Sequence, residues 1–187
     1  MKKLILCCMF LFLLLEMSKA QNVGIGTITP AARLHVTDSA VLFSGAVTAP
    51  PFTTTINPPA QGAGTRMMWF PALGAFRAGY VDGVQWDRDS IGQLSFVAGA
   101  NSKAKGNVSV ALGYNTNALN SFSTSMGGGT TASGIMSTSM GGVTVASGGY
   151  ATAMGFGTTA SGFRSTAIGD SSMASGESSI AMGKQSI

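Results

Sequence analysis

Few side chains of this sequence have the types and spacing that chemistry requires. His35 is the single histidine, so a histidine-based metal site or a charge-relay pair would lack its second member. Asp87 and Asp89 are close together, but they lie in a turn-like segment, where carboxylates are more often turn caps than a general acid and base. Gly169-Asp170-Ser171 could form a nucleophile turn, yet no histidine is available to activate its serine. We therefore expect no enzyme: no catalytic residue, no cofactor and no metal site.

The composition agrees with a structural or binding role. Only 10% of the 187 residues are charged, whereas about a quarter is usual, and 26 residues are glycine. The formal net charge is +4, but no basic cluster accompanies it, so we expect no nucleic-acid partner. The hydrophobic content of 45% argues against a disordered chain.

Residues 1–20 predict a secretory signal peptide. Two lysines open the segment, and the apolar run Leu4–Leu15 is too short to span a bilayer. Ser18-Lys19-Ala20 places small residues where a signal peptidase cleaves. Cys7 and Cys8 lie inside the apolar run, and the leucine before them is not small, so lipidation is disfavoured. The mature chain would then contain no cysteine and no membrane span.

The segment from 92 to 187 repeats with a period of 14 residues. One glycine column is Gly99, Gly113, Gly127, Gly141, Gly155, Gly169 and Gly183; a second is Gly106, Asn120, Gly134, Gly148, Gly162 and Gly176. The first column admits no substitute, which predicts a position where even a Cβ does not fit. The second admits Asn120, and because asparagine readily adopts positive φ, this column predicts a left-handed turn.

The segments between the glycines predict strands. They alternate in character, as in Ser165–Ile168, and a glycine every seven residues would destabilise a helix or coiled coil. We therefore predict an all-β fold, a β-solenoid with one coil of 14 residues per repeat. Large side chains such as Met154 suit the coil interior, and small ones such as Ala153 suit a surface that meets a neighbouring chain. The alternation alone also permits the reverse assignment.

The repeats resemble a known family. Asn107–Gly113, Ser165–Gly169 and Ser179–Gly183 are similar to the serine-x-alanine-apolar-glycine motif in the YadA-like heads of trimeric autotransporter adhesins, and Ala-Ser-Gly at 160–162 and 174–176 resembles its second half. The resemblance covers about half of the chain. It implies a left-handed parallel β-roll, a homotrimer, and display on the outer surface of a Gram-negative-type bacterium, often for cell adhesion.

Three segments precede the repeats. Residues 21–36 resemble a short N-terminal element of bacterial surface fibres and phage tail-fibre-like proteins, and 37–63 form a proline-rich connector. Residues 64–91 predict an aromatic β-hairpin cap, with strands at 66–70 and 75–81. After the second strand, an Asp-Gly pair at 82–83 predicts another hairpin turn, before 84–86.

The aromatic residues of the cap have two interpretations. They form either a compact core that closes the open end of the solenoid, or a candidate binding patch for a glycan or a protein. These residues are Trp69, Phe70, Phe76, Tyr80 and Trp86.

The sequence as a whole predicts a secreted or surface-displayed fibre or adhesin head segment. It would be non-catalytic and homotrimeric, and would mediate attachment to a host or environmental glycan or matrix protein. One alternative is a purely structural fibre segment whose binding or anchoring regions lie outside this chain. Another is an ice-binding solenoid, since threonines also repeat with the coil, at 116, 130, 144 and 158 and at 124, 138, 152 and 166. Because the sequence stops within a repeat at Ile187, we also expect further chain to cover that strand edge.

The leader provides a first test. The exported protein should begin at Gln21 and contain no cysteine, because cleavage after Ala20 removes Cys7 and Cys8. N-terminal sequencing and the intact mass of the secreted chain measure this directly. A secreted chain that begins at Met1, or that carries a lipid on a cysteine, would contradict it.

Overall fold

The computed structural model describes residues 22–37, 40–46 and 56–187. It divides into two compact units, 1–44 and 45–187, each of which is described by itself. The signal peptide expected at 1–20 and parts of the expected connector lie outside the described residues. Within the described ranges there are strands and two 3-10 turns, and no helix there is long and apolar enough to cross a membrane.

The first unit contains a short parallel strand pair. β1 (Val23–Ile25) lies beside β2 (Leu34–Val36), with Val23 opposite Leu34. His35 belongs to β2, and its Nδ1 accepts a hydrogen bond from the backbone N–H of Ala31 at 3.1 Å. The histidine therefore stabilises the local turn between the two strands.

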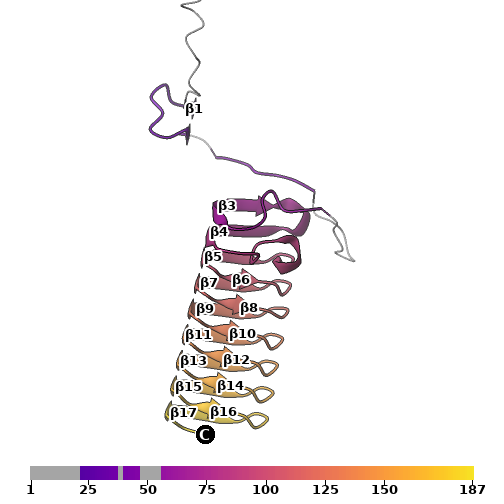
Figure 1. Ribbon diagram of the computed structural model, residues 1–187, viewed down its shortest axis with the longest axis vertical. Helices are drawn as coiled ribbons and strands as arrows, with labels where there is room; N and C mark the ends of the chain where they lie inside the picture. The colour runs from indigo at the N-terminus through magenta and orange to yellow at the C-terminus, as the bar shows by residue number, and fades with distance from the viewer. Residues whose placement is uncertain (1–21, 38–39, 47–55) are drawn as a thin grey trace, which may run out of the picture. The chain divides into compact units, whose positions relative to one another are not determined.

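The second unit is a stack of coils, each with one long and one short strand (Figure 1). The long strands are β5 (Phe96–Ala100), β7 (Val110–Tyr114), β9 (Thr124–Gly128), β11 (Thr138–Gly142), β13 (Thr152–Phe156), β15 (Thr166–Asp170) and β17 (Ile180–Lys184). The short strands are β6 (Lys103–Ala104), β8 (Asn117–Ala118), β10 (Thr131–Ala132), β12 (Val145–Ala146), β14 (Thr159–Ala160) and β16 (Met173–Ala174). All of these strands pair in parallel, the long ones in one sheet and the short ones in another.

The register of both sheets confirms the repeat. Met140 lies opposite Met154 in the long sheet, and Thr131 lies opposite Val145 in the short sheet. Each coil therefore advances the chain by one 14-residue repeat. The predicted all-β class and the β-solenoid with one coil per repeat are both confirmed.

The first glycine column is required by backbone conformation and by space. From Gly99 to Gly169, the φ angles of these glycines lie between 112° and 140°, a region that other residues rarely adopt. A Cβ at Gly155 would also overlap the carbonyl oxygen of Gly169 in the next coil. The expectation that no side chain fits this column is confirmed, and the cause is the close stacking of successive coils.

The second glycine column is not a left-handed turn, so that expectation is wrong. None of its glycines has positive φ; instead, a Cβ at Gly134 would overlap the carbonyl oxygen of Gly148 in the next coil. Positive φ, from 50° to 59°, occurs two residues further along, at Leu94, Val108, Phe122, Met136, Tyr150, Arg164 and Ser178. The backbone N–H at this position donates to the preceding coil, as Tyr150 does to the carbonyl of Ile135 at 2.8 Å, and this bond holds the turn.

The coil interior holds small side chains, so the expected inward placement of Met154 is wrong. Ala153 has no exposed surface, whereas Met154 points outward from β13 and is half-buried. The four inward positions of this coil are Ala151, Ala153, Thr158 and Ala160. The tight turns at both ends of the coil bring its two sheets close together, which leaves no room inside for a methionine.

Most hydroxyl groups inside the coils have local hydrogen-bond partners, although Thr116 Oγ1 and Ser165 Oγ have none. Ser139 Oγ donates to the carbonyl oxygen of Thr144 at 2.9 Å and lies 2.7 Å from Thr144 Oγ1. Ser125 and Thr130 repeat this arrangement one coil earlier. The column from Thr116 to Thr158 is thus interior, where polar groups need such partners.

A hairpin closes the first coil. β3 (Gly64–Phe70) and β4 (Ala75–Val81) are antiparallel and are joined by a 3-10 turn at Pro71–Leu73. β4 pairs in parallel with β5, so the hairpin extends the long sheet. The second hairpin expected at 82–86 does not form, because β5 already occupies the edge of β4 with which a further strand would pair.

Two adjacent glycines allow a matched test of coil stacking. Gly127→Ala should destabilise the rod by about 3 kcal/mol, because Gly127 has a φ of 115° and a Cβ there would overlap the Gly141 carbonyl oxygen. Gly128→Ala should change stability by less than about 0.5 kcal/mol, because a Cβ there meets nothing within 4 Å. Denaturant unfolding followed by circular dichroism measures both variants. Equal stabilities would contradict the stacking argument.

Candidate functional site

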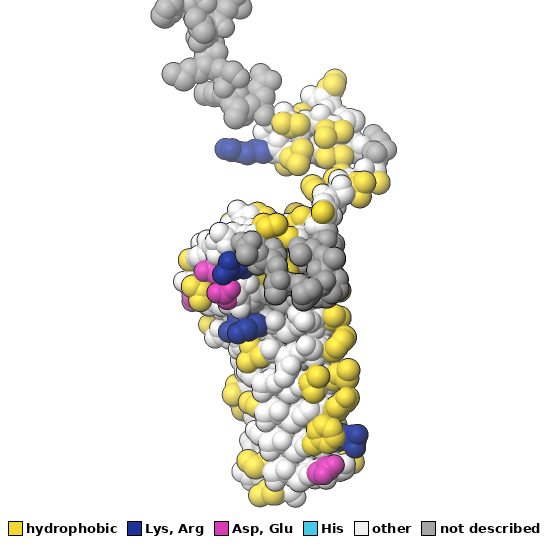
Figure 2. Space-filling view, turned by 90° about the vertical axis from the view of Figure 1, so that its right-hand side faces the viewer, with side chains coloured by type: hydrophobic (Ala, Val, Ile, Leu, Met, Phe, Trp, Pro, Cys, Tyr) yellow, Lys and Arg dark blue, Asp and Glu magenta, His cyan; other side chains and the backbone are white. Residues whose placement is uncertain are grey.

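The outer face of the long sheet is uncharged in two columns, one of which is apolar at every position. One outward column is Phe96, Val110, Thr124, Thr138, Thr152, Thr166 and Ile180; the other is Ala98, Leu112, Met126, Met140, Met154, Ile168 and Met182. We call these two columns the apolar face, and neither contains a charged residue. Figure 2 shows hydrophobic side chains in a stripe along one side of the rod, next to a surface that is mostly uncharged.

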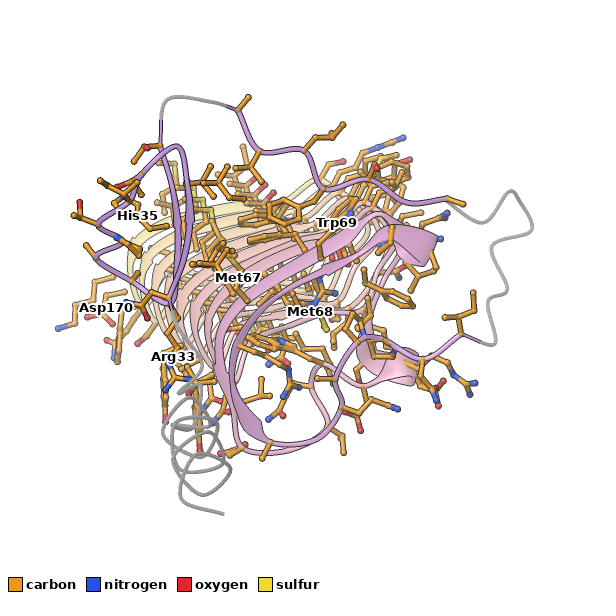
Figure 3. The ribbon with its side chains drawn as sticks, turned by 90° about the horizontal axis from the view of Figure 1, so that it is seen from above. Arg33, His35, Met67, Met68, Trp69 and Asp170 are labelled. Atoms are coloured by element: carbon orange, nitrogen blue, oxygen red, sulfur yellow. The ribbon has the colours of Figure 1, made fainter. Side chains whose placement is uncertain are left out.

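The apolar face continues onto the cap. Trp69 lies opposite Phe76, which lies opposite Phe96, and the rings of Phe76 and Phe96 stack with their centroids 5.3 Å apart. Met67 and Trp69 point to one side of β3 and Met68 to the other (Figure 3). The sheet therefore presents one continuous hydrophobic surface from β3 to β17.

The five aromatic residues of the candidate binding patch are divided between the core and the surface. Trp86 has no exposed surface and Phe70 only 3%, so both belong to the core of the cap. Trp69 is 39% exposed and Tyr80 45%, while Phe76 is half-buried between Trp69 and Phe96 of the first coil. The structure thus leaves Trp69, Phe76 and Tyr80 as surface candidates.

Trp86 closes the end of the coil stack. Its Nε1 donates to the carbonyl oxygen of Ser102 at 2.9 Å, which satisfies the one polar group of the ring. The guanidinium of Arg66 lies 5.4 Å from the ring centroid, a cation–π distance. Trp86 therefore plays the structural role that was one of the two interpretations of the cap.

A buried arginine ties the cap to the first coil. Arg77 lies opposite Val97 in the inward column and has no exposed surface. Its guanidinium donates to the carbonyl oxygens of Phe76, Ser95 and Ala104, at 2.8, 3.0 and 3.1 Å, and to Ser95 Oγ at 2.8 Å. Burial lowers the pKa of Arg77 to about 10, so the side chain remains charged at neutral pH.

The carboxylates of the cap have local structural partners. Asp87 accepts a hydrogen bond from the backbone N–H of Gly62 at 2.6 Å, and Asp89 pairs with Arg88 at 3.2 Å. Hydrogen bonds from Gln85 and then Asn101 lower the pKa of Asp82. Within the described part of the chain, histidine, cysteine and acidic side chains do not gather in groups of three.

The two edges of the rod carry side chains that the sequence analysis did not single out. At the positive-φ positions, Phe122, Met136 and Tyr150 are exposed, and Tyr150 packs edge-to-face on Phe163 with centroids 5.5 Å apart. Glycine or asparagine would adopt this backbone at lower cost. The 14-residue period shows that these large residues recur at one position of the repeat, but the sequence did not indicate that the backbone φ at this position is positive.

The stacked parallel coils place the protein in the class of β-solenoids. The model of the YadA head domain repeat matches residues 90–116, 104–130, 132–158 and 160–186, which together cover just over half of the chain. The chain therefore belongs to the YadA head repeat family, whose repeats are non-catalytic adhesin domains. No curated protein and no solved structure matches the chain.

Neighbouring residues on β13 test which face is inside. Ala153→Asp should cost several kcal/mol and abolish the β-rich circular dichroism, because the carboxylate would be buried without a partner. Met154→Asp should keep the β-rich spectrum, because the outward carboxylate reaches water. Thermal melting of both variants against the parent measures the difference. The inside-outside assignment would be overturned if Met154→Asp were the more damaging of the two.

Proposed function

We propose that the chain is the head segment of a trimeric adhesin displayed on the surface of a Gram-negative-type bacterium, and that it mediates attachment. Three left-handed β-rolls would pack their apolar faces, from β5 to β17, around a common axis, and the cap with Trp69 and Tyr80 would stay accessible at the end of the rod. The trimer and the handedness come from the family resemblance. The observation that carries the proposal is the apolar face itself, which extends over the seven long strands of the coils with no charged residue in its two columns.

The physical chemistry of this face favours burial against copies of itself. The column from Ala98 to Met182 is apolar at every position, and a hydrophobic stripe of this length is uncommon on a soluble monomer and marks an interaction surface. Methionines such as Met126, Met140 and Met154 adapt their shape to a partner more readily than branched side chains. Burial of the stripe in a trimer would leave the short sheet facing solvent.

Attachment would use the exposed aromatic residues of the cap. Trp69 and Tyr80 offer flat apolar surfaces with a polar group at one end, which suits a neutral glycan or a matrix protein. Because β3 is the terminal strand of the sheet, a trimer would bring three copies of this patch together at one end of the rod.

Two other functions remain as alternatives. A purely structural fibre segment would need the trimer but not the aromatic patch. An ice-binding solenoid would have to use Thr124, Thr138, Thr152 and Thr166, because the other threonine column lies inside the coils. Thermal hysteresis of the purified protein would identify this last function.

The proposal is tested by assembly and by binding. Light scattering of the exported chain should give a trimer, and Met154→Asp should shift it toward monomer. A panel of glycans and matrix proteins should yield a ligand whose affinity falls about tenfold or more in Trp69→Ala, the loss of one aromatic anchor. Phe156→Ala, an exposed aromatic residue far along the rod, is the matched control and should bind normally. A monomeric parent would refute the trimer, and a trimer without any ligand would favour the structural alternative.

A further inference from the structure

The few charges of the rod lie mostly on its two edges. Between 92 and 187 the charged residues are Lys103, Lys105, Arg164, Asp170, Glu177 and Lys184. Arg164 and Glu177 lie just before β15 and β17, at what we call the leading edge. Asp170 and Lys184 are the last residues of the same two strands, at what we call the trailing edge. Figure 3 shows Asp170 at the margin of the stack.

A leading-edge charge cannot reach the trailing edge of its own coil. Six or seven residues of nearly extended chain separate Arg164 from Asp170 and Glu177 from Lys184, a span of about 20 Å. Along each edge, opposite charges do occur in adjacent coils, since Asp170 lies opposite Lys184. Within the described residues, however, none of these four side chains forms an ion pair.

Two of the four side chains have other local contacts, which leave their charges open. The guanidinium of Arg164 lies 4.7 Å from the ring centroid of Phe163, and Asp170 Oδ1 accepts a hydrogen bond from Ser171 Oγ at 2.8 Å. Arg164, Glu177 and Lys184 are exposed and Asp170 is partly exposed. Each charge is therefore accessible to another molecule.

The signs on the two edges are complementary at one alignment. When a leading edge meets a trailing edge at the same level, Arg164 faces Asp170 and Glu177 faces Lys184, and both contacts attract. A shift by one coil in one direction brings Glu177 to Asp170, and a shift in the other direction brings Arg164 to Lys184. Both shifted contacts repel. The charges thus favour zero axial shift over either neighbouring register.

Zero shift is the condition for a closed ring. A contact between the leading edge of one copy and the trailing edge of the next is head to tail. Such a contact closes into a ring only when rotation brings the last copy back to the first without a rise, and otherwise continues as a helical filament. A charge pattern that selects zero shift therefore also selects closure.

We propose that the leading edge of one copy binds the trailing edge of the next at the same level, so that Arg164 contacts Asp170 and Glu177 contacts Lys184 around a closed ring. The proposal rests on the trimer proposed above and adds which edges meet and in which register. The apolar faces supply the buried area, and the edge charges set the alignment of the copies.

Cysteine cross-linking tests the contact, because the rod contains no cysteine of its own. In the full chain with Cys7→Ser and Cys8→Ser, two double variants are made: Arg164→Cys with Asp170→Cys, and Glu177→Cys with Lys184→Cys. A bis-maleimide linker much shorter than about 20 Å cannot join the two cysteines of one copy. Each double variant should give covalent trimers on a denaturing gel and no larger species, and each single variant should remain monomeric.

A shifted pair provides the register control. Phe156→Cys with Glu177→Cys joins edges that are two coils apart, about 10 Å along the rod, and should cross-link poorly. Circular dichroism confirms that each variant keeps its fold, and light scattering before cross-linking reports the assembly. Trimers in solution that the double variants fail to cross-link would overturn the edge contact and leave the proposed trimer intact. Dimers of a single variant, a ladder beyond three chains, or efficient cross-linking of the shifted pair would overturn it as well. Monomers throughout would refute the trimer and the edge contact together.

Discussion

The contact of one coil's backbone with the next, without an intervening side chain, determines the rest of this structure. At Gly155 and its equivalents, the carbonyl of the following coil occupies the space of a Cβ. Successive coils must therefore have nearly the same backbone, which is why glycine recurs at 14-residue intervals. The same close stacking gives every long strand two hydrogen-bonded neighbours, except at the ends of the sheet.

A tightly turned coil has a thin interior, and this reverses the usual distribution of large and small side chains. Alanine, serine and threonine fill the coils, as Ala153 and Thr158 do, and little apolar area is buried there per residue. The large apolar side chains lie outside, on the apolar face and at the edges. The stability that a globular domain obtains from its core must here come largely from strand pairing between coils and from the cap.

The cap covers the end of the solenoid, because the interior of a stack of coils would otherwise be open to solvent there. Here the inward column changes from alanine to Val97, Arg77 and Met68, and Trp86 covers the opening. The guanidinium of Arg77 donates hydrogen bonds to backbone carbonyl groups. These carbonyl dipoles solvate its charge in place of water. Large and charged residues thus appear inside the solenoid where the coil widens at its end.

The period, the strands and the first glycine column could be predicted from sequence, because they depend on spacing and on the absence of a Cβ. The direction in which Met154 points could not, since a strand that alternates Ala and Met has the same pattern whichever side faces in. The positive φ of Tyr150 could not be predicted from the sequence either, because the residues in its column are not those that favour this backbone conformation. The parallel pairing of β4 with β5 could not be predicted from the local Asp-Gly signal at 82–83, because it joins segments that are not adjacent in the sequence.

The proposed roles of the apolar face, which supplies buried area, and of the edge charges, which set the register, follow from the same geometry. A flat stack of identical strands presents an apolar face with a repeat of about 4.8 Å, so two such faces can slide by one coil and meet nearly the same surface again. Hydrophobic burial is non-directional and cannot distinguish these registers. Only features that break the repeat can do so, and in this rod those are the cap at one end and the four edge charges near the other. A nearly uncharged surface makes these charges more selective, because they are the only charged residues between 106 and 187.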